Sequence, residues 1–415
     1  MARPPGFHPP SYTHTSLPQV LPALAASIGV DLGGDMVGAG GGPGAGGGPG
    51  AGGGPGAGGG PGAGSEATAY GLGVRSARRA VVVLLDGLGL ELLRRRAGHA
   101  PFLRSLLPGS PDLTCGFPST TATSLASFGT GTPPGEHGLV GYQARIPGTE
   151  VIFDHLSWEN GPDPRAWQPD ATIFERVAAD GVAVTRIGLP YFAGSGLTVA
   201  SQRGGRFVGA RSLSEGVKAA VRAARADKRA LVFLYWGDID KFGHVHGCDS
   251  PEWTAALEEA DTQLRRLAEQ LPADASLTVT ADHGMVDIPF ADRIDLARDA
   301  ELDDGVVAIT NEPRAPHVYT LPGAATDVAA RWSGRFGDRA LILTREQAID
   351  EGWFGPVAAR NAARIGDVVA AFGPGLAVED SRTSKPILLS LLGMHGSLTS
   401  AETSVPLLHH AALAG

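Results

Sequence analysis

Three long apolar runs, each ending in acidic or histidine side chains, dominate the hydrophobic pattern of this chain. They are AVVVLLDGLG (80–89), ALVFLYWGDID (230–240) and ASLTVTADHGM (275–285). A continuous apolar run of this length is typical of a strand that is buried on both faces, as in a parallel sheet. We therefore expect three buried strands, each followed by a polar turn.

Segments with helical spacing lie between these runs. LELLRRRAG (90–98) follows the first strand, and residues 251–271 form an amphipathic pattern that opens with Ser250 as N-cap and Pro251 in the first turn. Strands that alternate with helices predict an α/β fold, a three-layer sandwich around a central, mostly parallel sheet. In such sheets, ligands bind beyond the carboxyl ends of the strands. The acids at the ends of the three runs therefore mark the expected site.

The rest of the chain divides by composition. Residues 1–37 are expected to carry a short helix that begins at Ser16 and packs on the core. Residues 38–64 contain GAGGGP four times in tandem, which predicts a disordered linker or loop expansion. Residues 65–415 are expected to form one catalytic domain. A smaller cap or insertion is expected within about 286–390, where the strand–helix rhythm is lost.

Charge and cysteine content narrow the choice of partners and compartment. The net charge of −9 over 415 residues argues against binding to the backbone of a nucleic-acid duplex. No apolar run is long enough for a membrane span. The two cysteines, Cys115 and Cys248, cannot make a disulfide framework, so we expect a cytoplasmic location, with export as the alternative. The sequence does not indicate the oligomeric state.

Acidic and histidine residues form four clusters that are candidates for metal binding. Mixtures of carboxylate and imidazole ligands suit Zn²⁺ and similar divalent cations, and six ligands divide naturally into two sites. Two cations about 4 Å apart can hold the attacking and leaving oxygens of a phosphoryl transfer. The residues are Asp86, Asp240 with His244, Asp282 with His283, and His395.

Five motifs occur in order within residues 80–410: LLDGLG, FPSTTATSLASFGTGTPPGEHGLVGY, DIDKFGHVHG, TADHGM and GMHGSL. This series resembles the motifs of the alkaline phosphatase superfamily, and most closely those of its nucleotide pyrophosphatase/phosphodiesterase branch. The resemblance implies a small-molecule phosphoester or nucleotide substrate and hydrolysis of phosphodiester or pyrophosphate bonds. A phosphomonoesterase or phosphonate hydrolase on the same metal core is the alternative, and a non-catalytic binding protein is the alternative of another class.

The resemblance also implies roles for individual residues. Thr121 matches the nucleophile, which would form a covalent phospho-threonine and contact one metal. Asp86, Asp282 and His283 match the ligands of that metal. Asp240, His244 and His395 match the ligands of a second metal, and both are expected to be zinc.

The chain departs from the pattern of this branch close to the nucleophile. Ser124 stands where the branch usually has asparagine, so we expect its hydroxyl to contact a substrate phosphate oxygen. Thr120 stands where lysine is common. No candidate is evident for the arginine and the third-metal ligands that mark the monoesterase branch.

Several alternatives remain open at this stage. A slipped alignment would choose Ser119 or Thr120 as the nucleophile, Asp238 competes with Asp240, and His246 competes with His244. Arg314 and His317 would either line the substrate pocket or belong to a solvated turn. We expect three further residues to be structural or inert: His137, Cys115 and Cys248.

Overall fold

The computed structural model describes residues 6–13, 15–33 and 71–411. The predicted repeat linker at 38–64 therefore lies outside the described residues. A 3₁₀ turn, η1 (Leu17–Gln19), follows Ser16 and leads into α1 (Val20–Ser27), whose side chains are mostly buried.

A six-stranded sheet forms the centre of the protein, and its strand order is β18-β8-β1-β7-β5-β6. The strands from β8 to β6 run parallel to one another, and only β18 pairs in the antiparallel direction. This arrangement confirms the predicted mostly parallel α/β sheet. The strands are β1 (Arg79–Leu85), β5 (Ala183–Gly188), β6 (Arg206–Gly209), β7 (Ala230–Trp236), β8 (Ala275–Thr280) and β18 (Leu407–Ala411).

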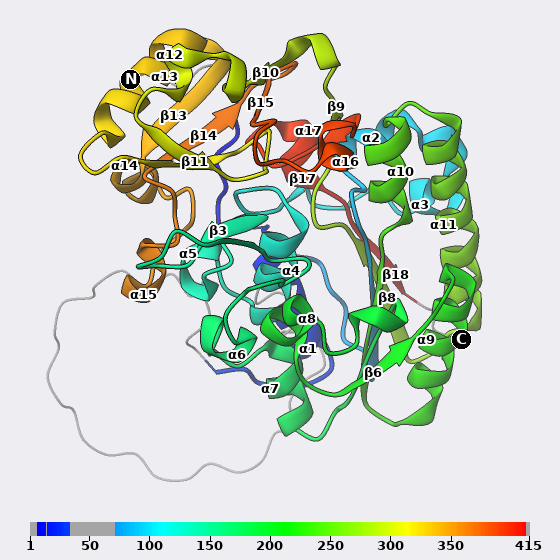
Figure 1. Cartoon of the computed structure of the whole chain (residues 1–415). Helices are drawn as coiled ribbons and strands as arrows, with labels where there is room; N and C mark the ends of the chain where they lie inside the picture. The colour runs from blue at the N-terminus through cyan, green and yellow to red at the C-terminus, as the bar shows by residue number, and fades with distance from the viewer. Residues whose placement is uncertain (1–5, 14, 34–70, 412–415) are drawn as a thin grey trace, which may run out of the picture.

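Helices cover both faces of this sheet, which gives three layers (Figure 1). One layer holds α9 (Leu213–Ala226) and α11 (Pro251–Gln270). The opposite layer holds α1, α4 (Thr121–Thr130), α7 (Ile173–Ala179) and α8 (Gly196–Gln202). The strands are apolar along nearly their whole length because side chains on both faces are covered by helices.

Local signals explain where two important helices begin and end. In α11, the Ser250 hydroxyl accepts from the backbone N–H of Trp253 at 3.1 Å and Pro251 occupies the first position, which confirms the predicted start. In α4, the extended Thr120 precedes the helix, and Gly131 ends it with a left-handed φ of 72°. Every residue of α4 is buried.

A second, smaller sheet lies beside the central one and forms the yellow and orange part of Figure 1. Its strand order is β11-β12-β14-β13, all neighbours are antiparallel, and it has its own apolar cluster around Trp332. Its elements are β11 (Val306–Ile309), β12 (His317–Thr320), α13 (Ala325–Phe336), β13 (Ala340–Thr344) and β14 (Val368–Phe372).

The remaining elements are short. The helices are α2 (Leu90–Arg95), α3 (Pro101–Ser105), α5 (Pro134–His137), α6 (Pro164–Trp167), α10 (Asp238–His246), α12 (Ala300–Asp303), α14 (Arg345–Asp350), α15 (Ala359–Ala362), α16 (Pro386–Leu389) and α17 (Ser400–Thr403). The 3₁₀ turns are η2 (Ala97–His99), η3 (Pro190–Phe192), η4 (Phe290–Asp292), η5 (Leu296–Arg298) and η6 (Gly337–Arg339). The two-stranded ribbons pair β2 (Leu113–Thr114) with β17 (Ser404–Val405), β3 (Gln143–Arg145) with β4 (Ile152–Asp154), β9 (Val286–Asp287) with β16 (Gly393–Met394), and β10 (Arg293–Asp295) with β15 (Ala377–Glu379). Among the described residues, no helix has the length and apolar character needed to cross a membrane.

Candidate active site and metal centre

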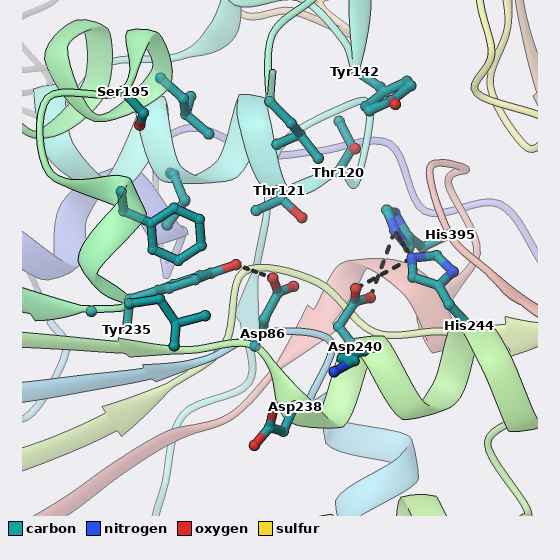
Figure 2. Close-up of a pocket in the computed structure, with 18 of the residues that line it drawn as sticks. Asp86, Thr120, Thr121, Tyr142, Ser195, Tyr235, Asp238, Asp240, His244 and His395 are labelled. Carbon is teal, nitrogen blue, oxygen red and sulfur yellow. Dashed lines mark hydrogen bonds and ion pairs between the residues drawn. The ribbon is translucent and has the colours of Figure 1, made fainter. Parts of the chain in front are cut away.

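The predicted ligands lie beyond the carboxyl ends of three neighbouring strands, β8, β1 and β7. Asp86 follows β1 directly, and Asp282 and His283 follow β8. Asp240 and His244 lie one turn apart on α10, which continues from β7. His395 follows β16, and Thr121 is the first residue of α4. Figure 2 shows Thr121 above Asp86 and Asp240, with His244 and His395 to one side.

One group of ligand atoms consists of Asp86, Asp282 and His283, which lie within 4.8 Å of one another. His283 Nε2 is 3.3 Å from Asp86 Oδ1 and 3.8 Å from Asp282 Oδ2. The Thr121 hydroxyl is 3.2 Å from the same histidine nitrogen. These three side chains and the hydroxyl therefore face a common point.

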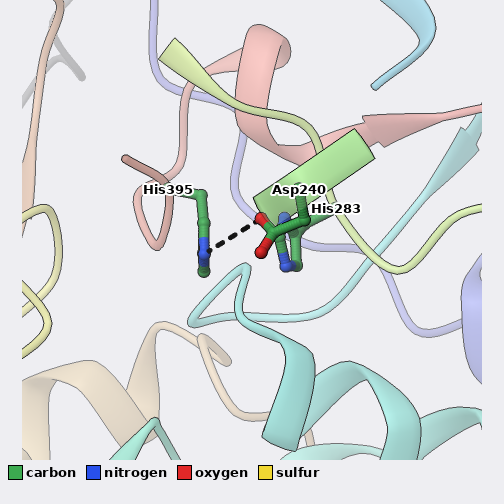
Figure 3. Close-up of side chains that lie close together, drawn as sticks. All are labelled: Asp240, His283 and His395. Atoms are coloured by element: carbon green, nitrogen blue, oxygen red, sulfur yellow. Dashed lines mark ion pairs between the residues drawn. The ribbon is translucent and has the colours of Figure 1, made fainter. Parts of the chain in front are cut away.

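A second group lies beside the first and contains Asp240 and His395, with His283 shared between the groups (Figure 3). The rings of His283 and His395 stack with centroids 3.7 Å apart. His244 Nε2 lies 3.3 Å from both Asp240 Oδ2 and His395 Nε2. His244 therefore extends this second group, next to the shared histidine.

The three histidines are held in one orientation by backbone carbonyl groups. Nδ1 lies 2.7 Å from the Gly393 oxygen in His244, 3.1 Å from the Gly284 oxygen in His283, and 2.9 Å from the Ser119 oxygen in His395. An imidazole that donates from Nδ1 presents the lone pair of Nε2 to the centre of the cluster. This is the usual orientation of a histidine that binds a metal.

In each of the three carboxylates, the two oxygens have different surroundings. Asp86 Oδ2 accepts from the Tyr235 hydroxyl, Asp282 Oδ1 accepts from the Gly87 and His283 N–H groups, and Asp240 Oδ2 faces His244. The other oxygen of each carboxylate is buried without a hydrogen-bond partner among the described residues. A site with three carboxylate oxygens that accept no hydrogen bond, next to three imidazole lone pairs, suits divalent cations.

The electrostatics of the cluster agree with this fit. Burial, followed by the charges of Asp282 and Asp240, raises the pKa of Asp86 well above its usual range. Burial also raises the pKa of Asp282. Burial acts to raise the pKa of Asp240 as well, but the contacts with His244 and the charges of His395 and His283 together outweigh burial, and the pKa is lowered. Three carboxylates packed this closely repel one another unless a cation or proton lies between them.

The three neighbouring hydroxyls before and in α4 have different surroundings. Thr121 and Thr120 line the cavity, but only the Thr121 hydroxyl contacts a predicted ligand, His283. The Ser119 hydroxyl donates to the Ser397 carbonyl oxygen at 2.8 Å and is fully buried. The geometry therefore favours Thr121 over Ser119 as the hydroxyl that meets the cluster.

Ser124, predicted to contact the substrate, lies outside the lining of the cavity. It is fully buried on α4, and its hydroxyl faces the thiol of Cys115. Ser124 therefore contacts the core and not the cavity, although it lies only three residues after Thr121 on α4. Tyr142 does line the cavity, although the sequence analysis gave it no role.

The other open alternatives also have defined positions. Asp238 lines the cavity and accepts from the indole N–H of Trp236 at 2.7 Å, and His246 is exposed. Arg314 is fully buried in an ion pair with Glu402 at 2.7 Å, and neither it nor His317 lines the cavity. His137 pairs with the Ser127 hydroxyl at 2.9 Å, away from the cavity. Both cysteines are buried free thiols.

A cavity of about 550 Å³ opens beside Thr121, and two residues in its lining had no signal in the sequence. Glu312 is almost fully buried, and one of its oxygens has no partner among the described residues. Burial raises the pKa of Glu312 to about 8, although contacts with Thr120 and Tyr142 lower it in part. Tyr235 lies near the end of the apolar strand β7, so the sequence alone indicates a buried strand residue and no role in the site.

Comparisons with known proteins agree with the fold. The model of the type I phosphodiesterase / nucleotide pyrophosphatase family matches residues 80–398. An uncharacterized pyrophosphatase/phosphodiesterase of Schizosaccharomyces pombe is 26% identical over 219 residues, which cover 49% of this chain and 44% of that protein. This chain therefore matches less than half the length of that curated relative.

Two solved structures share the fold at low sequence identity. Murine ectonucleotide pyrophosphatase / phosphodiesterase 5 superposes with a TM-score of 0.65 at 21% identity, over 80% of this chain and 87% of that chain. Phosphonoacetate hydrolase from Sinorhizobium meliloti superposes with a TM-score of 0.62 at 21% identity, over 80% of this chain and 90% of that chain. An inactive variant of the murine protein has been solved in complex with AMP.

The fold is alkaline phosphatase-like, and the site brings a threonine hydroxyl together with clustered carboxylates and imidazoles. More narrowly, the chain belongs to the type I phosphodiesterase / nucleotide pyrophosphatase family.

Proposed function

We propose that this protein hydrolyses phosphodiester or nucleotide pyrophosphate bonds through a covalent intermediate on Thr121, with two divalent cations held by the six predicted ligands. The observation that carries the proposal is the convergence of these ligands with the Thr121 hydroxyl beyond the ends of three neighbouring strands. Asp86, Asp282 and His283 would hold one cation, and Asp240, His244 and His395 the other. The donor set of oxygens and imidazole nitrogens suits zinc.

When bound, the cations supply positive charge that lowers the pKa of the Thr121 hydroxyl and offsets the charge on the phosphoryl oxygens. Thr121 lines the cavity at the N-terminus of α4, and the free backbone N–H groups of a helix N-terminus favour an anionic group. The cations and the N–H groups of α4 act in the same direction, since both stabilise negative charge at the same position.

The reaction then has two displacement steps. Thr121 Oγ1, after loss of its proton to solvent, attacks phosphorus; the Oγ1–P bond forms and the P–O bond to the leaving group breaks. The leaving alcohol or phosphate takes up a proton. Water then attacks phosphorus, the Oγ1–P bond breaks, and the threonine oxygen is protonated again.

A cytoplasmic location remains a prediction from the cysteine content.

Replacement of the nucleophile tests the proposal. We expect Thr121→Ala to lower kcat for methyl p-nitrophenyl phosphate by about 10³-fold or more, because the displacement loses its attacking atom. The content of zinc, measured by elemental analysis of the purified protein, should stay close to two per chain, because the six side-chain ligands remain.

Thr123→Ala is the matched control. Thr123 lies two residues further along α4, is fully buried, has no hydrogen-bond partner among the described residues, and does not line the cavity. It should keep near-normal turnover. Normal turnover in Thr121→Ala, or an equal loss in both variants, would contradict the assignment.

A further inference from the structure

The cavity beside Thr121 continues into an arm with apolar walls. Its side chains come from α4, the loop after β4, the end of β5, α8 and β6, which are far apart in the sequence. Figure 2 shows Ser195 and Tyr235 on this side of Thr121, and His244 and His395 on the other. We call this part of the cavity the apolar arm; its walls include Leu125, Leu156, Ile187, Leu189, Leu197 and Phe207.

Few polar side chains accompany the apolar walls: Ser195, Thr198 and Gln202 come from the same segment of the lining. The Ser195 hydroxyl donates to the Thr198 hydroxyl at 3.0 Å, so these two groups are already paired with each other. A polar group that entered the arm would lose its water and gain few hydrogen bonds, which is unfavourable. The walls therefore favour an apolar group.

The aromatic rings of the arm do not form a slot for a planar base. Phe192 and Tyr235 pack edge to face, with centroids 5.7 Å apart and planes at 73°. Tyr191 and Phe192 also pack edge to face, at 4.5 Å and 60°. A base that stacks between two rings needs two nearly parallel faces with an open gap, whereas these rings contact one another. The arm therefore suits a flexible aliphatic chain better than a nucleobase.

The charges around the cavity oppose a substrate with additional phosphate groups. Apart from the proposed metal ligands, the described lining contains three acidic side chains, Asp238, Glu312 and Glu379. Lys241 is the one lysine or arginine in that lining. A second or third phosphate would add negative charge beside Asp238 and Glu379, with a single lysine to offset it; Glu312, whose pKa is about 8, adds little charge at neutral pH.

We propose that the site prefers phosphodiesters with an uncharged aliphatic ester chain of several carbons over nucleoside polyphosphates. The chain occupies the apolar arm while the phosphoryl group lies at Thr121. This inference rests on the proposed function and narrows it to one class of substrate. Burial of each methylene in the arm should raise kcat/KM by up to about fourfold.

The test uses the zinc-loaded full-length protein and four substrates: methyl, butyl and hexyl p-nitrophenyl phosphate, and ATP. We expect kcat/KM to rise by at least about fiftyfold from the methyl to the hexyl ester, since part of the chain stays in contact with water. The hexyl ester should exceed ATP by at least about tenfold. A flat dependence on chain length, or a preference for ATP, overturns the inference.

Two exposed apolar residues provide a matched pair of variants. Leu156 lines the arm and is 43% exposed, whereas Val151 lies outside the cavity lining and is 45% exposed. Both positions are partly in solvent, so a glutamate at either one should leave the fold intact. We expect Leu156→Glu to lower the ratio of kcat/KM for the hexyl ester to kcat/KM for the methyl ester by about tenfold. Val151→Glu should change neither value, and equal effects of the two variants contradict the proposal.

The outcome also separates this inference from the proposed function. Hydrolysis of the methyl ester that depends on Thr121, without any effect of chain length, overturns the inference and leaves the proposed function in place. Hydrolysis of ATP alone overturns the inference and leaves the proposed function in place, whereas hydrolysis of neither ATP nor any ester overturns both.

Discussion

Tyr235 links a predicted metal ligand to the substrate cavity. Its hydroxyl donates to Asp86 Oδ2, and its ring lines the cavity wall. Asp86 Oδ1 accepts no hydrogen bond among the described residues and lies 3.3 Å from His283 Nε2, so the bond from Tyr235 leaves one defined oxygen for a cation. Hydrogen bonds of this kind orient carboxylate ligands and tune their affinity. Tyr235 therefore acts on the proposed metal site through the position of Asp86.

We expect Tyr235→Phe to weaken zinc binding about 10- to 100-fold, because Asp86 loses the donor that holds its carboxylate. Competition with a chromophoric chelator would measure the dissociation constant of each zinc ion in the absence of substrate. Tyr142→Phe removes a hydroxyl from another tyrosine of the cavity lining that contacts no predicted ligand, so it should bind zinc normally. Unchanged zinc affinity in Tyr235→Phe would show that the hydrogen bond does not position the ligand.

The position of α4 depends on its close packing against α8. Small residues fill α4, and Gly129 lies directly against the backbone of α8, so that an added Cβ would overlap the Ser201 carbonyl oxygen. Backbone atoms cannot move aside as a flexible side chain can. The nucleophile helix therefore requires glycine at this position to reach its place beside the sheet.

Gly129→Ala should lower the free energy of unfolding by about 1–3 kcal/mol or more, because the two helices must separate to admit the methyl group. Gly334→Ala is the control within another helix, α13, where an added Cβ meets nothing within 4 Å. That variant should be more stable than the wild type by about 0.5–1 kcal/mol through the better helix propensity of alanine. Urea denaturation of both variants would check these signs, and a neutral Gly129→Ala would contradict the close packing.

Three buried histidines meet where the small sheet joins the central domain, around residues 137–142. His155 Nδ1 lies 2.8 Å from the Gly141 carbonyl oxygen, and His317 Nε2 in β12 lies 4.0 Å from the position that a Cβ on Gly141 would occupy. Burial lowers the pKa of His137 to about 3, of His155 to about 4 and of His317 to about 3. An unfolded histidine titrates near 6.5, so the folded protein binds fewer protons than the unfolded chain between about pH 4 and 6.5. These histidines therefore lower the stability as the pH falls through that window.

His155→Gln tests the effect, because the amide can still donate to Gly141 while the titrating group is lost. The wild type should lose about 2 kcal/mol more stability than the variant between pH 6.5 and 5, since about 1.36 kcal/mol accompanies each pH unit below the unfolded pKa. The measurement is the difference in the free energy of unfolding of the two zinc-loaded proteins at several pH values. A difference that stays constant from pH 7 to 5 would refute the low pKa of His155.

Much of the fold could be predicted from local patterns. The apolar runs before Asp86, Asp240 and Asp282 predicted buried parallel strands, because a strand covered on both faces must be apolar along its whole length. Ser250 predicted the start of α11, because capping depends only on residues a few positions apart. The segment after about residue 286 has no regular alternation of strands and helices, so the second sheet could not be predicted from the sequence.

The candidate ligands could be chosen because each follows an element that the hydrophobic pattern already placed at one edge of the sheet. Ser124 could not be placed in this way, since its direction depends on which face of α4 meets the core. Arg314 was equally ambiguous, because its partner Glu402 lies 88 residues away in the sequence.

Periodicity, capping residues and the order of the motifs depend on neighbours along the chain, and these were enough for the class of fold and the set of candidate ligands. The orientation of Ser124, the entry of Glu312 into the cavity and the contact of Tyr235 with Asp86 depend on packing between segments that are distant in sequence. Such contacts arise only when the chain has folded, because burial decides which side of each element faces the site.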